Sequence, residues 1–231
     1  KQDVIKPKSN FFPVGVKVIY EPIDLIKAEE NKVLLESGRV LNYDYLIVST
    51  GTETRPDETP GLKENLWYKN IFDFYTIEGA LALQKYFKNW EGGKLVMCIA
   101  ELPYKCPVAP IEFVCLAEAF FAKKGMRDKV EITYVTPMSG AFTKPVATKM
   151  LSELLKDKNI EVVPDFYLER VDNENKKIIS YDGREIEFDV LTIVPVNLGS
   201  EMIARSGIGD DMNFVLTNKF TLRSDLHENI F

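Results

Sequence analysis

The sequence has little of what metal sites and disulfide frameworks need. It contains a single histidine, His227, and three cysteines, none of which forms a C-x-x-C pair. One histidine excludes a histidine-rich metal centre, and the cysteine spacing predicts neither a zinc site nor a disulfide framework. We therefore expect no bound metal and an intracellular, reducing setting.

Long apolar runs and an excess of basic charge are also absent. No segment approaches the roughly 20 unbroken apolar residues that a membrane-spanning helix requires. Lysine and arginine total 29 against 35 acidic residues, giving a net charge of −6, and there is no basic cluster. This balance argues against nucleic acid as a partner.

What is present is enough apolar material for a sizeable core. The chain has 231 residues, 45% of them hydrophobic, which allows one large domain or two smaller ones. It begins with Lys1 rather than methionine, and Glu228-Asn229-Ile230-Phe231 has the pattern of a strand that has only begun. We therefore expect an interior fragment of a longer protein.

An internal repeat indicates the architecture. Val18 to Gly51 reads VIYEPIDLIKAEENKVLLESGRVLNYDYLIVSTG, and Val163 to Pro195 reads VPDFYLERVDNENKKIISYDGREIEFDVLTIVP. The two align without a gap, and each predicts a three-stranded meander that returns into a buried, nearly all-apolar strand. Those final strands are expected at Tyr45 to Ser49 and at Val190 to Val194.

Between the copies, helical and extended patterns alternate. Strands are expected at 95–100, 130–135 and 160–163, and helices at about 76–90, 110–124 and 144–157. The apolar side of the last helix is expected to contain Val146, Met150, Leu151, Leu154 and Leu155. The alternation predicts an α/β fold with a Rossmann-like parallel sheet.

The repeat also predicts the domain boundaries. Each copy resembles the meander that closes a nucleotide-binding domain of two-domain flavoproteins. The resemblance implies that residues 60–196 form a complete domain of the NAD(P)-binding type. It also implies that residues 1–59 form part of an FAD-binding domain whose opening βαβ unit is missing, and that residues 197–231 return to that domain.

Small residues follow the first repeat in Ser49-Thr50-Gly51-Thr52, where they would let a ligand approach the backbone closely. The alternative is an ordinary turn at a strand end. Together with Asn42-Tyr43-Asp44-Tyr45-Leu46, this segment resembles the A-T-G and Y-D-x-L elements of two-domain flavoproteins of the pyridine nucleotide-disulfide oxidoreductase superfamily. The resemblance implies that Thr50, Gly51 and Thr52 lie beside FAD.

In the domain at 60–196, the segment that would bind a nicotinamide dinucleotide lacks the residues that such a site requires. After the strand at 95–100 the chain reads Ala100-Glu101-Leu102-Pro103-Tyr104-Lys105-Cys106-Pro107, without a glycine. The two prolines supply no N–H donors and Glu101 would repel a phosphate. The next strand ends at Tyr134-Val135-Thr136-Pro137, without the acidic residue that binds the ribose. The nucleotide site of this domain is therefore expected to be degenerate.

A cysteine occupies this loop instead. Lys105-Cys106-Pro107-Val108-Ala109-Pro110-Ile111-Glu112 resembles the C-P-x-x-P-x-E element of sulfide:quinone reductases and flavocytochrome c sulfide dehydrogenases. In that family the cysteine sits over the flavin, so the resemblance implies that Cys106 is catalytic and that Pro107 contacts the cofactor. The adjacent helix N-terminus and Lys105 both favour the thiolate.

The remaining candidates have simpler interpretations. Cys98 lies in a buried strand and Cys115 on a helix among apolar residues, so packing explains both. Glu112 stabilises the first turn of its helix, although a proton-carrying role is an alternative. His227 lies in a polar run and is expected at the surface.

The resemblance implies an enzyme that oxidises sulfide or a related sulfur species through redox cysteines and FAD. The electron acceptor would be a quinone or a cytochrome, and the location cytoplasmic or peripheral to a membrane, through a C-terminal segment beyond residue 231. One departure is that Asn70 to Tyr75 holds no cysteine where the family usually has one.

Two alternatives stay open: an NADH dehydrogenase or disulfide reductase of the same fold, and a non-catalytic assembly subunit. The 231-residue piece alone is expected to bind FAD weakly or not at all and to be inactive.

Overall fold

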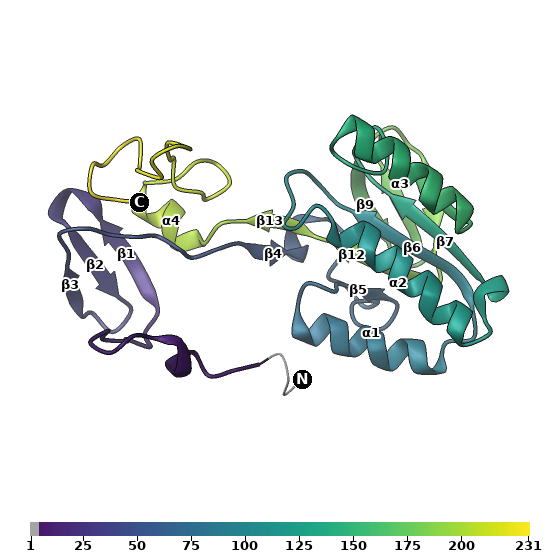
Figure 1. Ribbon diagram of the computed structural model, residues 1–231, viewed down its shortest axis with the longest axis horizontal. Coiled ribbons are helices and arrows are strands. Elements are labelled where there is room, and N and C mark those ends of the chain that lie inside the picture. Colours follow the sequence, from purple (N-terminus) through teal and green to yellow (C-terminus); the bar gives the residue numbers. More distant parts are fainter. Residues whose placement is uncertain (1–4) are drawn as a thin grey trace. The chain divides into compact units, whose positions relative to one another are not determined.

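The computed structural model describes residues 5–231 and divides the chain into two compact units (Figure 1). One unit comprises the chain up to Thr50 together with Gly199–Phe231, and the other comprises Gly51–Leu198. The sequence predicts boundaries at 59/60 and 196/197, whereas the two units divide at 50/51 and 198/199. None of the described helices is long and apolar enough to cross a bilayer.

A five-stranded parallel sheet forms the centre of the larger unit. Its strands, in spatial order, are β5 (Ile71–Phe72), β12 (Val190–Val194), β6 (Gly93–Ile99), β7 (Val130–Val135) and β8 (Ile160–Val163). Every neighbouring pair is parallel. The α/β fold with a Rossmann-like parallel sheet that the sequence predicts is confirmed.

The two faces of this sheet are covered by different elements (Figure 1). Helices α1 (Ile77–Asn89), α2 (Ala109–Lys123) and α3 (Pro145–Asp157) share one apolar cluster with Leu95, Met97 and Ile99 of β6. The alternate residues of β6, Val96 and Cys98, pack in a second cluster with residues of the meander. Burial on both faces explains why these strands are apolar at every position.

Helix α3 differs from the prediction. Of its expected apolar side, Leu155 is fully buried, whereas Val146 is 77% and Met150 66% exposed. The helix packs on β8, which is the last strand of the sheet. At this edge the sheet can cover only part of an apolar helix face.

The two meanders correspond residue for residue. They consist of β1 (Ile23–Lys27), β2 (Lys32–Leu35) and β3 (Val40–Asn42), and of β9 (Leu168–Asp172), β10 (Lys177–Ser180) and β11 (Glu185–Glu187). Lys27 pairs with Lys32 as Asp172 pairs with Lys177, and the same register irregularity recurs in both copies. The turn glycines Gly38 and Gly183 both have φ of 83°, which is unfavourable for other residues. The internal repeat is confirmed in three dimensions.

The correspondence extends to a tripeptide that the sequence comparison missed. Asn70-Ile71-Phe72 and Asn229-Ile230-Phe231 are identical. Ile71 pairs in parallel with Leu191, and Ile230 pairs in parallel with Leu46, the equivalent position of the first copy. Each meander therefore returns to an Asn-Ile-Phe segment in its own unit.

The expected strand from Tyr45 to Ser49 is only partly formed. It makes an isolated bridge between Leu46 and Ile230, and Tyr45 and Ile47 are each 75% exposed. Their equivalents in β12 are fully buried because β12 has β6 on its other side. The described residues of the smaller unit provide no counterpart of β6.

Three short elements complete the fold. In the larger unit β4 (Glu53–Arg55) and β13 (Val196–Leu198) form an antiparallel ribbon. In the smaller unit α4 (Glu201–Ser206) packs against β1.

Candidate functional site

Cys106 lies at the carboxyl end of the parallel sheet, in the loop that joins β6 to α2. Its side chain is exposed, and its φ of 59° is in the left-handed region. A residue with a Cβ held there costs about 1–3 kcal/mol and persists only where the surroundings impose it. The Cys106 carbonyl accepts a 3.1 Å hydrogen bond from the backbone N–H of Ala109, at the start of α2.

Two tyrosines brace the Cys106 loop, and the sequence interpretation named neither of them. The hydroxyl of Tyr75 donates to the Lys105 carbonyl at 2.5 Å and lies 3.5 Å from the Cys106 carbonyl. The hydroxyl of Tyr104 donates to the Pro107 carbonyl at 3.3 Å. The chain thus fixes the carbonyls on either side of the cysteine sulfur and leaves the sulfur accessible. The sequence offered one signal for Tyr75. The residue lies just before the N-cap of α1, Thr76, in the segment where the resembled family usually has a cysteine.

Burial keeps both phenols in the form that can donate. It raises the pKa of Tyr75, and the nearby Cys106 adds to this effect. Burial, again reinforced by Cys106, raises the pKa of Tyr104 to about 12. Both hydroxyls are therefore protonated donors over the physiological pH range.

The first turn of α2 is poorly suited to bind a phosphate through its backbone N–H groups. The N–H of Ala109 is bonded to Cys106 and that of Glu112 to Val108, and Pro110 has no N–H. Ile111, which follows, is 5% exposed. A helix N-terminus binds phosphate through free, accessible N–H groups, and Ala109, Pro110 and Glu112 do not provide one.

The end of β7 is likewise closed to a ribose. Thr136 is fully buried, its N–H donates to the Val163 carbonyl, and its hydroxyl accepts from the N–H of Met138. These bonds occupy the polar atoms at the position where dinucleotide-binding domains present an acidic residue. The geometry supports the degenerate nucleotide site expected from the sequence.

The other two cysteines are less accessible than Cys106. Cys98 is fully buried in β6, and burial raises the pKa of its thiol. Cys115 on α2 is partly buried, and its pKa is raised chiefly by burial, with Lys158 lowering it and Glu118 raising it. Packing roles agree with the sequence interpretation of both residues.

The segment expected to contact FAD has unsatisfied polar atoms. Gly51 has φ of 71°, and Thr52 lies directly before β4. The Thr52 hydroxyl is buried without a hydrogen-bond partner, as is Oδ1 of Asn197 on β13, a residue that is 3% exposed. One orphaned buried polar atom lies on β13 and the other directly before its partner strand β4, and both fit a ligand that carries hydrogen-bonding groups, as the ribityl and isoalloxazine groups of FAD do. Thr50, Gly51, Thr52 and Pro107 are all accessible or partly accessible.

His227 is less exposed than its polar sequence context predicts. Its side chain is 16% exposed, and Nδ1 lies 3.8 Å from a carboxylate oxygen of Glu29. Glu112 is exposed in the first turn of α2, as expected. Among residues 5–231 no cluster of three or more His, Cys, Asp or Glu side chains could hold a metal ion.

Comparisons with known proteins show what the chain is similar to. Residues 81–195 match the family described as "Sulfide dehydrogenase [flavocytochrome c] flavoprotein chain, central". The mitochondrial sulfide:quinone oxidoreductase of Dictyostelium discoideum is 25% identical over 236 residues, covering 100% of this chain and 52% of that protein. The chain is therefore similar to sulfide:quinone oxidoreductases over its whole length, and its central part is similar to the flavoprotein chain of sulfide dehydrogenase.

Solved structures show the same fold. The sulfide:quinone oxidoreductase from the hyperthermophilic bacterium Aquifex aeolicus matches with a TM-score of 0.77 at 22% identity, over 92% of this chain and 51% of that one. A chain in the mitochondrial ATP synthase assembly of Tetrahymena thermophila matches with a TM-score of 0.66 at 23% identity, over 91% of this chain and 54% of that one. The chain therefore spans about half the length of the relatives it matches.

Proposed function

We propose that the chain is part of a flavin-dependent oxidoreductase that oxidises sulfide or a related sulfur species through Cys106. The observation that carries the proposal is the conformation of Cys106. Its exposed sulfur belongs to a left-handed residue at the carboxyl end of the sheet, and the Tyr75 hydroxyl donates a hydrogen bond to the carbonyl of the preceding residue, Lys105. Strain of this kind concentrates at functional sites. The similarity to sulfide:quinone oxidoreductases supports the same chemistry.

The proposed step is a thiol–disulfide exchange. In the resting enzyme Cys106 is joined in a disulfide to a second redox cysteine, which the family resemblance places beyond residue 231. Sulfide attacks the sulfur of that second cysteine, a new S–S bond forms there as a persulfide, and the bond to Cys106 breaks. Cys106 leaves as a thiolate with the electron pair of the broken bond. When Cys106 forms a new S–S bond with the outer sulfur of the persulfide, two electrons and one proton are released. FAD, when bound, supplies a two-electron acceptor, from which a quinone or cytochrome takes the electrons.

Residues of this chain have distinct roles in that step. Tyr75 and Tyr104 donate hydrogen bonds to the carbonyls of Lys105 and Pro107, on either side of Cys106. These bonds keep the Cys106 sulfur in one position while its disulfide breaks and forms again. Thr50, Gly51, Thr52 and Pro107 are proposed to contact the cofactor, with Asn197 as an additional partner. Glu101 and the occupied first turn of α2 keep a phosphate out, so electrons enter through sulfur.

Differential alkylation of the full-length protein tests this proposal. Iodoacetamide is applied to the resting enzyme and to enzyme treated with sulfide in the absence of an acceptor, and labelled peptides are quantified by mass spectrometry. Cys106 is expected to be protected at rest and labelled after sulfide, because the exchange frees its thiolate. Cys115, partly buried on α2, is the internal control and should not respond to sulfide. Labelling of Cys106 that is independent of sulfide would contradict the proposal.

A second candidate is a non-catalytic subunit of a larger assembly. The match to a chain in the Tetrahymena thermophila ATP synthase favours it, since this fold occurs there within a multisubunit complex. Cofactor content separates the candidates. The full-length protein purified with stoichiometric flavin supports the oxidoreductase, whereas protein without flavin that also fails to bind added FAD supports the assembly subunit.

A further inference from the structure

A cavity of about 560 Å³ opens at the carboxyl ends of β6 and β7, within the larger unit. Open α/β sheets bind ligands beyond the carboxyl ends of their strands, and this volume suits a small organic molecule. Its lining includes residues that follow the two strands and residues of the second meander: Glu101, Leu102, Pro137, Tyr167, Tyr181 and Asp182.

The two tyrosines are the main aromatic surface of the cavity. Tyr167 directly precedes β9 and Tyr181 directly follows β10, and the N–H of Tyr181 donates to the Tyr167 carbonyl at 3.0 Å. This bond makes them neighbours on adjacent strands. Their side chains are 56% and 75% exposed, so both rings keep a face available for a ligand. Leu102 and Pro137 extend the apolar wall.

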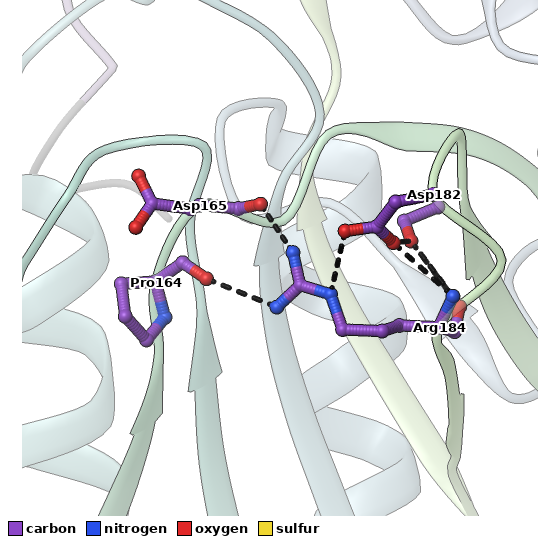
Figure 2. Close-up of polar contacts among 5 residues, drawn as sticks. Pro164, Asp165, Asp182 and Arg184 are labelled. Carbon is purple, nitrogen blue, oxygen red and sulfur yellow. Dashed lines mark hydrogen bonds and ion pairs between the residues drawn. The ribbon is translucent and has the colours of Figure 1, made fainter.

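The charge of the cavity wall is negative. Asp182 accepts hydrogen bonds from Ser180 and from the backbone and side chain of Arg184, and these lower its pKa. Figure 2 shows that the Arg184 guanidinium points to the carbonyls of Pro164 and Asp165 as well as to Asp182. Asp182 is therefore held as a carboxylate in a fixed position.

Glu101 adds a second carboxylate, from the loop after β6. It is exposed, lines the cavity and makes no ion pair with any residue between 5 and 231. Arg184 offsets the charge of Asp182 only, so the cavity retains the negative charge of Glu101. Aromatic rings together with carboxylates bind organic cations, through attraction of the cation to the ring faces and to the negative charge.

We propose that this cavity binds an organic cation that carries an aromatic or quaternary ammonium group. Its flat or methylated part packs against Tyr167 and Tyr181, and its positive charge faces Glu101 and Asp182. The carboxylates that attract a cation also repel phosphate, so the cavity takes a ligand of opposite charge to the dinucleotide that this fold commonly binds there. The proposal does not depend on the chemistry of Cys106.

Calorimetric titration of the full-length protein with benzyltrimethylammonium chloride tests the proposal, with sodium benzenesulfonate at the same ionic strength as the probe of opposite charge. We expect saturable binding of the cation and none of the anion. Tyr181→Ala should weaken cation binding about fivefold to tenfold, since it removes one ring face. Glu101→Gln should weaken it about twofold to fivefold, because it removes the unpaired charge.

Matched variants serve as controls. Tyr20→Ala and Glu153→Gln replace exposed residues outside the cavity and should leave the affinity unchanged. Circular dichroism verifies that all variants are folded. The proposal is overturned if the cation does not bind saturably, if benzenesulfonate binds as well as the cation, or if Tyr181→Ala and Glu101→Gln both bind the cation like the unchanged protein.

Discussion

The hydroxyl of Tyr75 donates a 2.5 Å hydrogen bond to the carbonyl of Lys105, the residue directly before Cys106. Tyr75 comes from the segment before α1 and Cys106 from the loop before α2, so this bond joins two loops at the carboxyl edge of the sheet. Cys106, the residue after this bonded carbonyl, has a left-handed backbone conformation.

Removing this hydroxyl is expected to loosen the Cys106 loop. In Tyr75→Phe the ring still packs, but the Lys105 carbonyl loses its donor, which lowers the free energy of unfolding by about 1 kcal/mol. The rate of sulfide-dependent flavin reduction in the full-length enzyme should fall about tenfold, because the sulfur is no longer held in one position. Urea unfolding and stopped-flow absorbance measure the two effects. Tyr20→Phe, at an exposed residue, is the control. An unchanged rate of flavin reduction in Tyr75→Phe would show that Tyr75 does not position the Cys106 sulfur.

Stability should depend on pH in the alkaline range. Tyr104 has a pKa of about 12 in the folded chain, above the value near 10 of an unfolded tyrosine. A group whose pKa is raised by folding contributes stability below its unfolded pKa and loses that contribution as the pH rises through the folded value. The free energy of unfolding should therefore fall between about pH 10 and pH 12. In Tyr104→Phe the free energy of unfolding, measured by urea titration at each pH, should fall less over this range. The same dependence on pH in both proteins would show that Tyr104 does not cause the fall.

The Asn-Ile-Phe segments make the same side-chain bond in each unit. Asn70 Nδ2 donates to the Asp189 carbonyl at 3.0 Å, and Asn229 Nδ2 donates to the Asp44 carbonyl at 3.0 Å. Asn70→Ala should lower the free energy of unfolding by about 1–2 kcal/mol, since it removes this bond and a 3.2 Å bond to Tyr86. Asn89→Ala, at an exposed site, should change it by less than about 0.5 kcal/mol in the same urea titration. Equal losses in the two variants would mean that the Asn70 bonds are not stabilising.

These bonds illustrate how far the sequence could predict the fold. The aligned meanders were recognisable because polar turns, glycines and alternating apolar residues recur in the same order. The Asn-Ile-Phe correspondence is only three residues long, and it becomes significant when the pairings of Ile71 and Ile230 are seen. Local patterns specify strands and turns, whereas strand partners depend on the whole chain.

Exposure was the least predictable property. The apolar residues of α3 indicate a helix, but Val146 and Met150 are exposed because β8 is the last strand of the sheet. The loop that contains Cys106 was predictable from its prolines and missing glycines. The bonds from Tyr75 were not, since they join residues about 30 positions apart in the sequence.

NADH should not replace sulfide as the reductant. Pro110 and the bonded N–H groups of Ala109 and Glu112 leave the first turn of α2 without the donors that hold a pyrophosphate. In the full-length protein, anaerobic mixing with NADH should leave the flavin absorbance unchanged over the time in which sulfide bleaches it. Rapid bleaching by micromolar NADH would favour an NADH dehydrogenase instead.

The most direct measurement is anaerobic stopped-flow absorbance of the full-length protein mixed with sulfide, comparing the unchanged enzyme, Cys106→Ser and Cys115→Ser. The account predicts rapid flavin bleaching in the unchanged enzyme and in Cys115→Ser, and its loss in Cys106→Ser, since only that variant lacks the sulfur that carries the electron pair. Bleaching by Cys106→Ser at the rate of the unchanged enzyme would contradict the account.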